Sequence, residues 1–194
     1  MERFSLDFEL TDGVGWAHAK VMVGQATHET AVSYLTADPL GSFANALMAL
    51  AWPAEGTIVF INRSAPDIGA EAFRAREFVW DDEPGGWRWV LSPADEGQAK
   101  LRIEKVRGRL KPALPLIDAI CSLEEMASAC ARCIENLAVK HGVVGYRLKW
   151  HDGDLPLSQC LLLRRWLKSP RINPTRVERG TWREDVAELL LLGA

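Results

Sequence analysis

Residues 33–53, SYLTADPLGSFANALMALAWP, carry the clearest structural signal in the chain. Asp38 is a good N-cap residue, and Pro39 follows at the first helical position, where a missing N–H and a fixed φ are tolerated. Apolar residues then recur at helical spacing: Leu40, Phe43, Ala44, Leu47, Leu50 and Ala51. This spacing predicts a helix that ends before Trp52–Pro53 and buries its apolar side against a sheet.

The sequence before this helix predicts three strands. Phe4, Leu6, Phe8 and Leu10 alternate with polar residues, which is the pattern of a half-buried strand. Asp12–Gly13 indicates a hairpin turn, after which residues 16–23 form the returning strand. Residues 30–35 are rich in Val, Thr and Tyr and predict a third strand that leads into the helix.

The sequence after this helix predicts further strands at 57–62, 73–80, 87–91, 101–106 and 114–121, and three more helices. Ser122 with Glu125 caps a helix that ends at Lys140–Gly142, and residues 146–150 form a short strand or an irregular segment. Asp154 caps a helix over 155–167, and Thr181 caps a final one. We therefore expect an α+β domain over residues 1–168, in which an antiparallel sheet of hairpins has helices packed mainly on one face. Residues 169–194 form a C-terminal arm and a short amphipathic helix.

Composition and charge narrow the class of protein. The 194 residues suit one globular domain, and no run approaches the roughly 20 apolar residues of a membrane-spanning helix. The opening MERFSLDFEL lacks the basic-then-apolar run of an export signal, so we expect a cytoplasmic protein with free thiols. Residues 1–98 contain 6 Lys/Arg against 15 Asp/Glu, whereas residues 99–194 contain 17 against 11. Such an asymmetry favours steered binding to charged partners.

Motifs for catalysis or metal binding are weak or missing. Cys130 lies on the apolar stripe of its predicted helix with Cys133 one turn later, which favours core packing over zinc or redox chemistry. His151–Asp152 resembles an HD metal motif but lacks the further ligands that such a site needs. The chain has no phosphate-binding glycine loop and no nucleophile elbow. We therefore predict no catalytic residues, no metal and no cofactor, and we lean towards a protein that is not an enzyme.

The turn Asp81–Asp82–Glu83, beside Trp87 and Trp89, is the best candidate for a functional surface. Carboxylates that frame exposed aromatic side chains suit a basic protein partner, and we expect Asp81, Asp82, Glu83 and Trp87 to make the contacts. The competing interpretation places the tryptophans in the core and leaves the acids as solvated turn residues.

Three other surfaces are alternatives to this turn. Basic residues between Lys100 and Lys111 suit a solvated strand face better than a nucleic-acid site, because the sequence pI is about 5.8. A pocket between sheet and helices near Trp150 and His151 would make the protein an enzyme or a small-molecule binder. The C-terminal apolar residues Trp182, Leu189 and Leu190 also need a surface to pack against, and a second copy of the chain could supply it.

Three segments together resemble a loosely defined group of small bacterial proteins of uncharacterised activity: SYLTADPLGSFANALMAL, FVWDDEPGGWRWVL and LIDAICSLEEMASACARCIENL. In that group an SYL…DxLG helix start precedes a D-x-EPG-x-x-RW hairpin, a strand and an amphipathic helix. The resemblance covers residues 30–165 in order, with departures at 63–69 and in the tail, and it implies no catalytic residues. By analogy with small acidic α+β immunity proteins, we hypothesise that the chain neutralises a basic toxin domain by direct contact.

Overall fold

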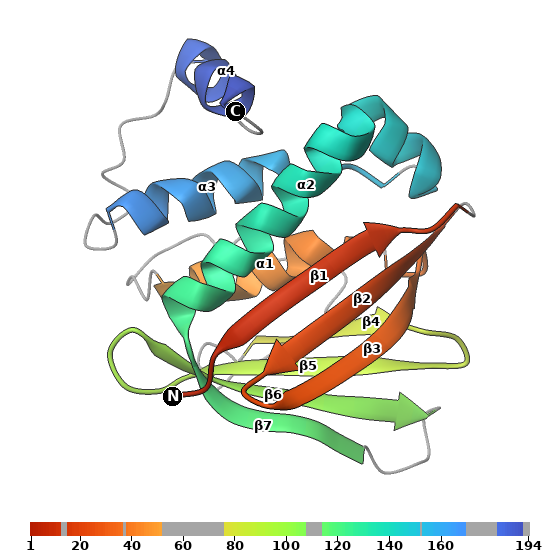
Figure 1. Cartoon of the computed structure of the whole chain (residues 1–194), viewed down its shortest axis with the longest axis vertical. Helices are drawn as coiled ribbons and strands as arrows, with labels where there is room; N and C mark the ends of the chain where they lie inside the picture. The colour runs from red at the N-terminus through yellow and green to blue at the C-terminus, as the bar shows by residue number, and fades with distance from the viewer. Residues whose placement is uncertain are drawn as a thin grey trace, which may run out of the picture.

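The computed structural model describes residues 1–12, 15–36, 38–51, 76–107, 114–151, 153–169 and 182–191. Within these residues the chain forms a three-stranded sheet, a four-stranded sheet and four helices (Figure 1). Both sheets are antiparallel. The predicted α+β class is therefore confirmed, with two sheets in place of the single one expected. The strand predicted at 57–62 lies outside the described residues.

The first sheet has the order β1 (Phe4–Leu10), β2 (Trp16–Val23), β3 (Ala26–Ser33). Its first strand buries every second side chain, as the period-two pattern predicts. The third strand begins at Ala26 rather than at Thr30, because Gly24, with φ 58°, allows a tight turn directly after β2. The predicted three-stranded meander is confirmed.

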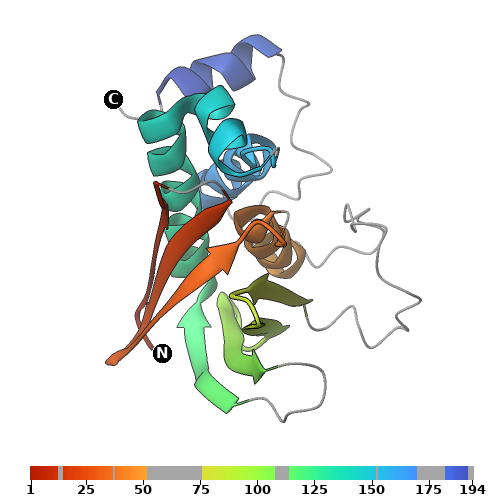
Figure 2. The same cartoon turned by 90° about the vertical axis from the view of Figure 1, so that its right-hand side faces the viewer.

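The second sheet has the order β4 (Arg76–Asp81), β5 (Gly85–Pro93), β6 (Gln98–Arg107), β7 (Leu114–Ser122). Trp80 and Trp89 are fully buried, and their ring centroids lie 4.5 Å apart. The sheets contact each other beside β7, where the Glu2 N–H donates to the Ile120 carbonyl oxygen at 2.8 Å, and again between β3 and β4. Figure 2 shows the two sheets diverging from each other, with α1 (Pro39–Ala51) between them.

Helix α1 forms as its sequence predicts. The Asp38 carboxylate accepts a hydrogen bond from the Gly41 N–H at 2.7 Å, so Asp38 is the N-cap. Phe43 is fully buried, and its ring lies 5.9 Å from that of Phe4 in the first sheet and 5.3 Å from that of Trp89 in the second. The apolar stripe of α1 thus joins both sheets into one hydrophobic core.

Helix α2 (Leu123–Lys149) runs along the edge of β1 and packs against α1 and α3 (Figure 1). Ser122 caps its N-terminus, as predicted, by accepting from the Glu125 N–H at 3.3 Å. Gly142, with φ 65° and ψ 173°, breaks the helix at the predicted end. The chain then resumes the helix, so the strand suggested for residues 146–150 is wrong. Burial of Tyr146 and Trp150 favours this continuation.

Helices α3 (Leu157–Lys168) and α4 (Trp182–Leu190) complete the described chain. The prediction that Asp154 caps α3 is wrong. The N-cap position is held by Pro156, and Asp154 instead pairs with Arg147 at 2.5 Å. Thr181, the predicted cap of α4, lies outside the described residues. Among the helices that the structure describes, none combines the length and apolar character needed to cross a membrane.

Candidate binding surfaces

The acidic turn, residues Asp81, Asp82 and Glu83, connects β4 to β5 and is anchored on two sides. The Asp81 N–H donates to Thr36 Oγ1 at 2.7 Å, just beyond β3. Asp82 accepts from Thr30 Oγ1 at 3.3 Å and lies 3.6 Å from Lys105 Nζ. Glu83 is exposed. Because Asp81 and Asp82 also hold the turn in place, Glu83 is the carboxylate most accessible to a partner.

Trp87 lies in the core beneath this turn. Only 2% of its surface is exposed, and its ring packs edge-on against His28 of β3 at 6.2 Å. The structure thus brings the three carboxylates together in one turn, with Glu83 exposed and Asp81 and Asp82 partly buried, but places Trp87 where a partner does not reach it. Aromatic or apolar contacts to a partner have to come from other residues.

The acidic turn concentrates negative charge. Burial raises the pKa of Asp81 above its usual value, and the neighbouring carboxylates Glu83 and Asp82 raise it further. Glu83 and Asp82 each raise the pKa because their negative charge disfavours a second negative charge close by. A cation placed against the turn would relieve this repulsion, so the turn is electrostatically suited to a basic group.

Four exposed apolar side chains follow the end of β3 or lie on the last turns of α2, and we call them the β3–α2 surface: Tyr34, Leu35, Val144 and Leu148. Leu35 is 57% exposed, and Val144 and Leu148 are 73% and 70% exposed. The Tyr34 ring stacks on His151 at 4.6 Å, which joins the end of β3 to the end of α2. In Figure 2 the end of β3, the last turns of α2 and the β4–β5 turn all lie on the side facing the viewer.

Sequence reasoning missed this surface because it ended the helix at Gly142. The signal was present in the spacing of Val144 and Leu148, which are four residues apart and share one face once the helix resumes.

Trp150 and His151, the predicted alternative pocket, have separate environments. Trp150 is 1% exposed, and its ring packs against those of Phe8 at 6.0 Å and Tyr146 at 6.4 Å. His151 is exposed, with a φ of 49°, and lies against Tyr34. The structure thus places the tryptophan in the core and the histidine at the edge of the β3–α2 surface.

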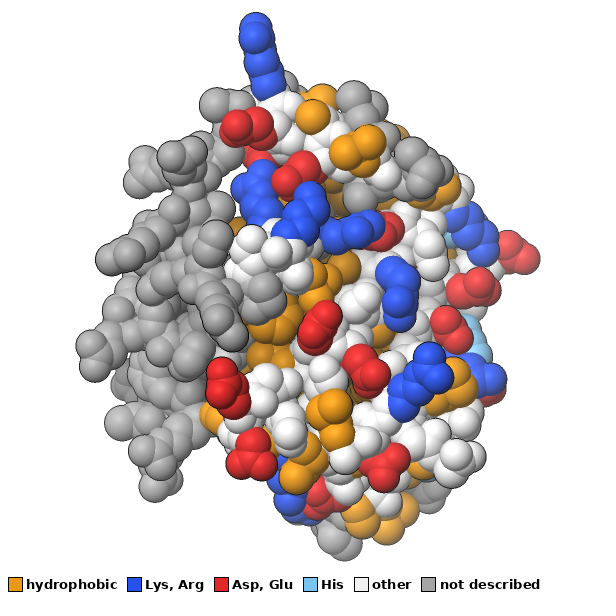
Figure 3. Space-filling model, turned by 60° about the vertical axis from the view of Figure 1, so that its left-hand side comes forward, with side chains coloured by type: hydrophobic (Ala, Val, Ile, Leu, Met, Phe, Trp, Pro, Cys, Tyr) orange, Lys and Arg blue, Asp and Glu red, His pale blue; other side chains and the backbone are white. Residues whose placement is uncertain are grey.

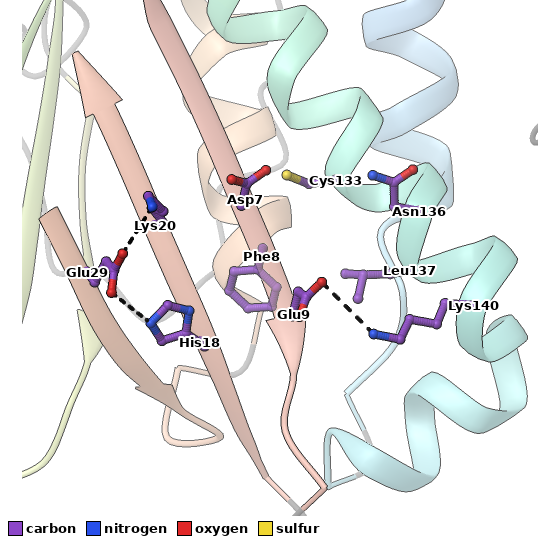
Figure 4. A pocket seen from close by; sticks show the side chains of 10 residues that line it. All are labelled: Asp7, Phe8, Glu9, His18, Lys20, Glu29, Cys133, Asn136, Leu137 and Lys140. Carbon is purple, nitrogen blue, oxygen red and sulfur yellow. Dashed lines mark ion pairs between the residues drawn. The ribbon is translucent and has the colours of Figure 1, made fainter. Parts of the chain in front are cut away.

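A groove of about 320 Å³ lies between β1 and α2 (Figure 4). Apart from Asp7, its charged side chains lie in ion pairs: Glu29 lies 3.2 Å from Lys20, with His18 3.5 Å from the same carboxylate, and Glu9 lies 4.0 Å from Lys140. A second groove of about 450 Å³ lies near the start of α2 and is lined by both Glu125 and Arg132. Figure 3 likewise shows acidic and basic side chains interspersed on one face of the molecule. The charges in these grooves compensate one another, so neither groove selects a ligand of one charge.

All four cysteines are free and buried: Cys121, Cys130, Cys133 and Cys160. Burial raises the thiol pKa to about 11 for Cys121, to about 12 for Cys133 and for Cys160, and well above the usual value for Cys130. The Cys133 thiol donates to the Leu6 carbonyl oxygen at 3.1 Å, so one backbone acceptor of the edge strand β1 has a hydrogen-bond donor on α2. The prediction that Cys130 and Cys133 pack in the core is confirmed. Within the described part of the chain, no group of three or more His, Cys, Asp or Glu side chains is arranged to hold a metal ion.

The predicted oligomerisation residues belong to α4. Leu189 is half-buried, and Leu191 beyond it is 69% exposed. The side chains of Trp182 and Leu190 lie outside the described part of the structure.

Comparison of the chain with known protein families, with curated proteins and with solved structures finds no match.

Proposed function

We propose that this chain is a non-enzymatic protein that acts by binding a partner protein through the acidic turn and the β3–α2 surface. The observation that carries the proposal is the exposure of Leu35, Val144 and Leu148 on the side of the molecule where the acidic turn is anchored to the chain just beyond β3 (Figure 2). Interfaces typically combine a central apolar contact with a charged rim, and this side of the molecule provides both.

The chemistry of this surface selects a partner with an apolar contact and a basic rim. Burial, with added repulsion from Glu83 and Asp82, raises the pKa of Asp81, and a lysine or arginine of the partner would be attracted to these carboxylates. A basic toxin domain is a partner of this kind, and the chain would then act as its immunity protein by covering part of its surface. A cytoplasmic location accords with four cysteines that are free and buried.

Reversal of the exposed charge in the acidic turn tests the electrostatic half of the proposal. Glu83→Lys is expected to lower the association rate constant for the purified partner about tenfold at low salt, because steering depends on the sign of the charge. The rate is measured by surface plasmon resonance at two salt concentrations. The matched control is Glu96→Lys, the same change at an exposed carboxylate in the turn between β5 and β6.

The control is expected to keep the association rate within about twofold of that of the unaltered chain. Equal effects of Glu83→Lys and Glu96→Lys would mean that the partner responds to net charge and does not contact the acidic turn.

A further inference from the structure

Helix α4 is held on α3 by charged groups. The Arg165 guanidinium donates to Asp185 at 2.5 Å and to Glu188 at 3.2 Å. Lys168 Nζ lies 3.8 Å from the same Glu188. Two carboxylates three residues apart on α4 therefore face two cations of the last turn of α3.

Among the α4 side chains that the structure describes, those of residues 183–189, none is fully buried, and Val186 and Leu189 are half-buried. Ion pairs at a protein surface typically contribute about 0–1 kcal/mol each and weaken as salt is added. The described part of the contact between α4 and α3 is therefore made by ion pairs that added salt weakens.

The two helices are complementary in charge. The last turn of α3 is basic, with Arg165 and Lys168, and the first turn of α4 is acidic, with Glu184 and Asp185. Arg164, next to Arg165, pairs with Glu135 of α2 and also lies close enough to Glu188 of α4 to feel its charge, whereas Arg165 and Lys168 pair directly with α4. Figure 3 shows basic side chains gathered on the helical part of the molecule, with acidic side chains among them.

We infer that α4 is a built-in competitor, which covers a basic face of α3 formed by Arg165 and Lys168. That face fits an acidic helical segment of another protein with two carboxylates three residues apart, as Asp185 and Glu188 are. Because α4 is tethered to the same chain, its effective concentration at α3 is high, on the order of millimolar for a short tether. An external segment displaces α4 only if it makes further contacts or if salt weakens the internal pairs.

The probe is a synthetic peptide of the α4 sequence WREDVAELL, acetylated and amidated, added to the full chain. Binding is followed by NMR through the Arg165 Nε–Hε signal, which reports directly on the guanidinium. We compare the unaltered chain with Asp185→Asn/Glu188→Gln, in which α4 keeps its shape but loses the two charges. The double variant is expected to reach half-maximal shift at a peptide concentration at least about threefold lower than the unaltered chain needs.

Two controls accompany this titration. A peptide with Asp and Glu replaced by Asn and Gln is expected to leave the Arg165 signal unmoved, and the signal of Arg132, exposed on α2, is expected to stay in place with either peptide. The inference is overturned if both chains respond at the same peptide concentration, if neither responds at a few millimolar peptide, or if the neutral peptide binds as well.

Discussion

Trp87→Ala is expected to destabilise the fold by about 3–5 kcal/mol, measured as the free energy of unfolding in urea. The indole is 2% exposed and packs between β5 and His28 of β3, so its removal leaves a cavity where the two sheets meet. Since small domains are stable by about 5–15 kcal/mol, the variant would lose a large share of its stability.

Trp87→Phe keeps most of the buried area and serves as the conservative control, with an expected cost about half as large or less. The opposite result would be a Trp87→Ala chain that is as stable as the unaltered one but no longer binds its partner. In that case Trp87 would be a contact residue, as the sequence pattern alone suggested, and the described packing would be wrong.

Asp38→Asn is expected to stabilise the protein at pH 7 by about 1–2 kcal/mol and to have little effect at pH 3.5. Burial raises the pKa of Asp38 from 3.8 to about 6, and the negative charge of Asp154 contributes, although the Gly41 N–H bond acts in the opposite sense. A shift of about 2 pH units corresponds to about 3 kcal/mol, which partial solvent access reduces. Asparagine caps a helix as well as aspartate does, so the bond to Gly41 is kept.

The sign of the pH dependence follows from the raised pKa. Between about pH 4 and pH 6 the folded chain holds a proton on Asp38 that the unfolded chain releases, so stability from this group falls as pH rises through that range. The free energy of unfolding, measured at several pH values, should fall over this range for the unaltered chain. The same fall should be absent in Asp38→Asn. Asp38→Ala also removes the helix cap, so it is expected to gain less stability at pH 7 than Asp38→Asn does. If Asp38→Asn were less stable than the unaltered chain at pH 7, the claim that the buried charge of Asp38 destabilises the fold would be wrong.

The sequence predicts correctly those helices and strands for which all the local signals indicate the same structure. The alternation of β1 and the Asp38–Pro39 start of α1 each have one interpretation, and burial against the core supports both. Gly142 was ambiguous, because a glycine after Lys140 is typical of a helix end whereas burial of Tyr146 depends on distant parts of the chain. Asp154 was misassigned for a similar reason, since Arg147 on the preceding helix competes for its carboxylate.

The candidate surface was only half predictable. The DDEPGG segment identifies a turn with three carboxylates, and the structure places them in one. Alternation put Trp87 and Trp89 on one side of a strand, but which side is covered depends on a second sheet that no local pattern places. The β3–α2 surface joins residues more than a hundred positions apart, and their proximity arises only from the tertiary fold.

Quantitative capture from the native host tests the central claim most directly. Three full-length chains are immobilised: the unaltered one, Leu148→Asp and Leu191→Asp. The two leucines are 70% and 69% exposed, so the changes are matched in chemistry and differ in place. The account predicts that the unaltered chain and Leu191→Asp retain the same basic protein in near-equimolar amount, and that Leu148→Asp loses at least about nine-tenths of it. Equal retention by all three chains, or retention of no protein by any of them, would contradict binding through the β3–α2 surface.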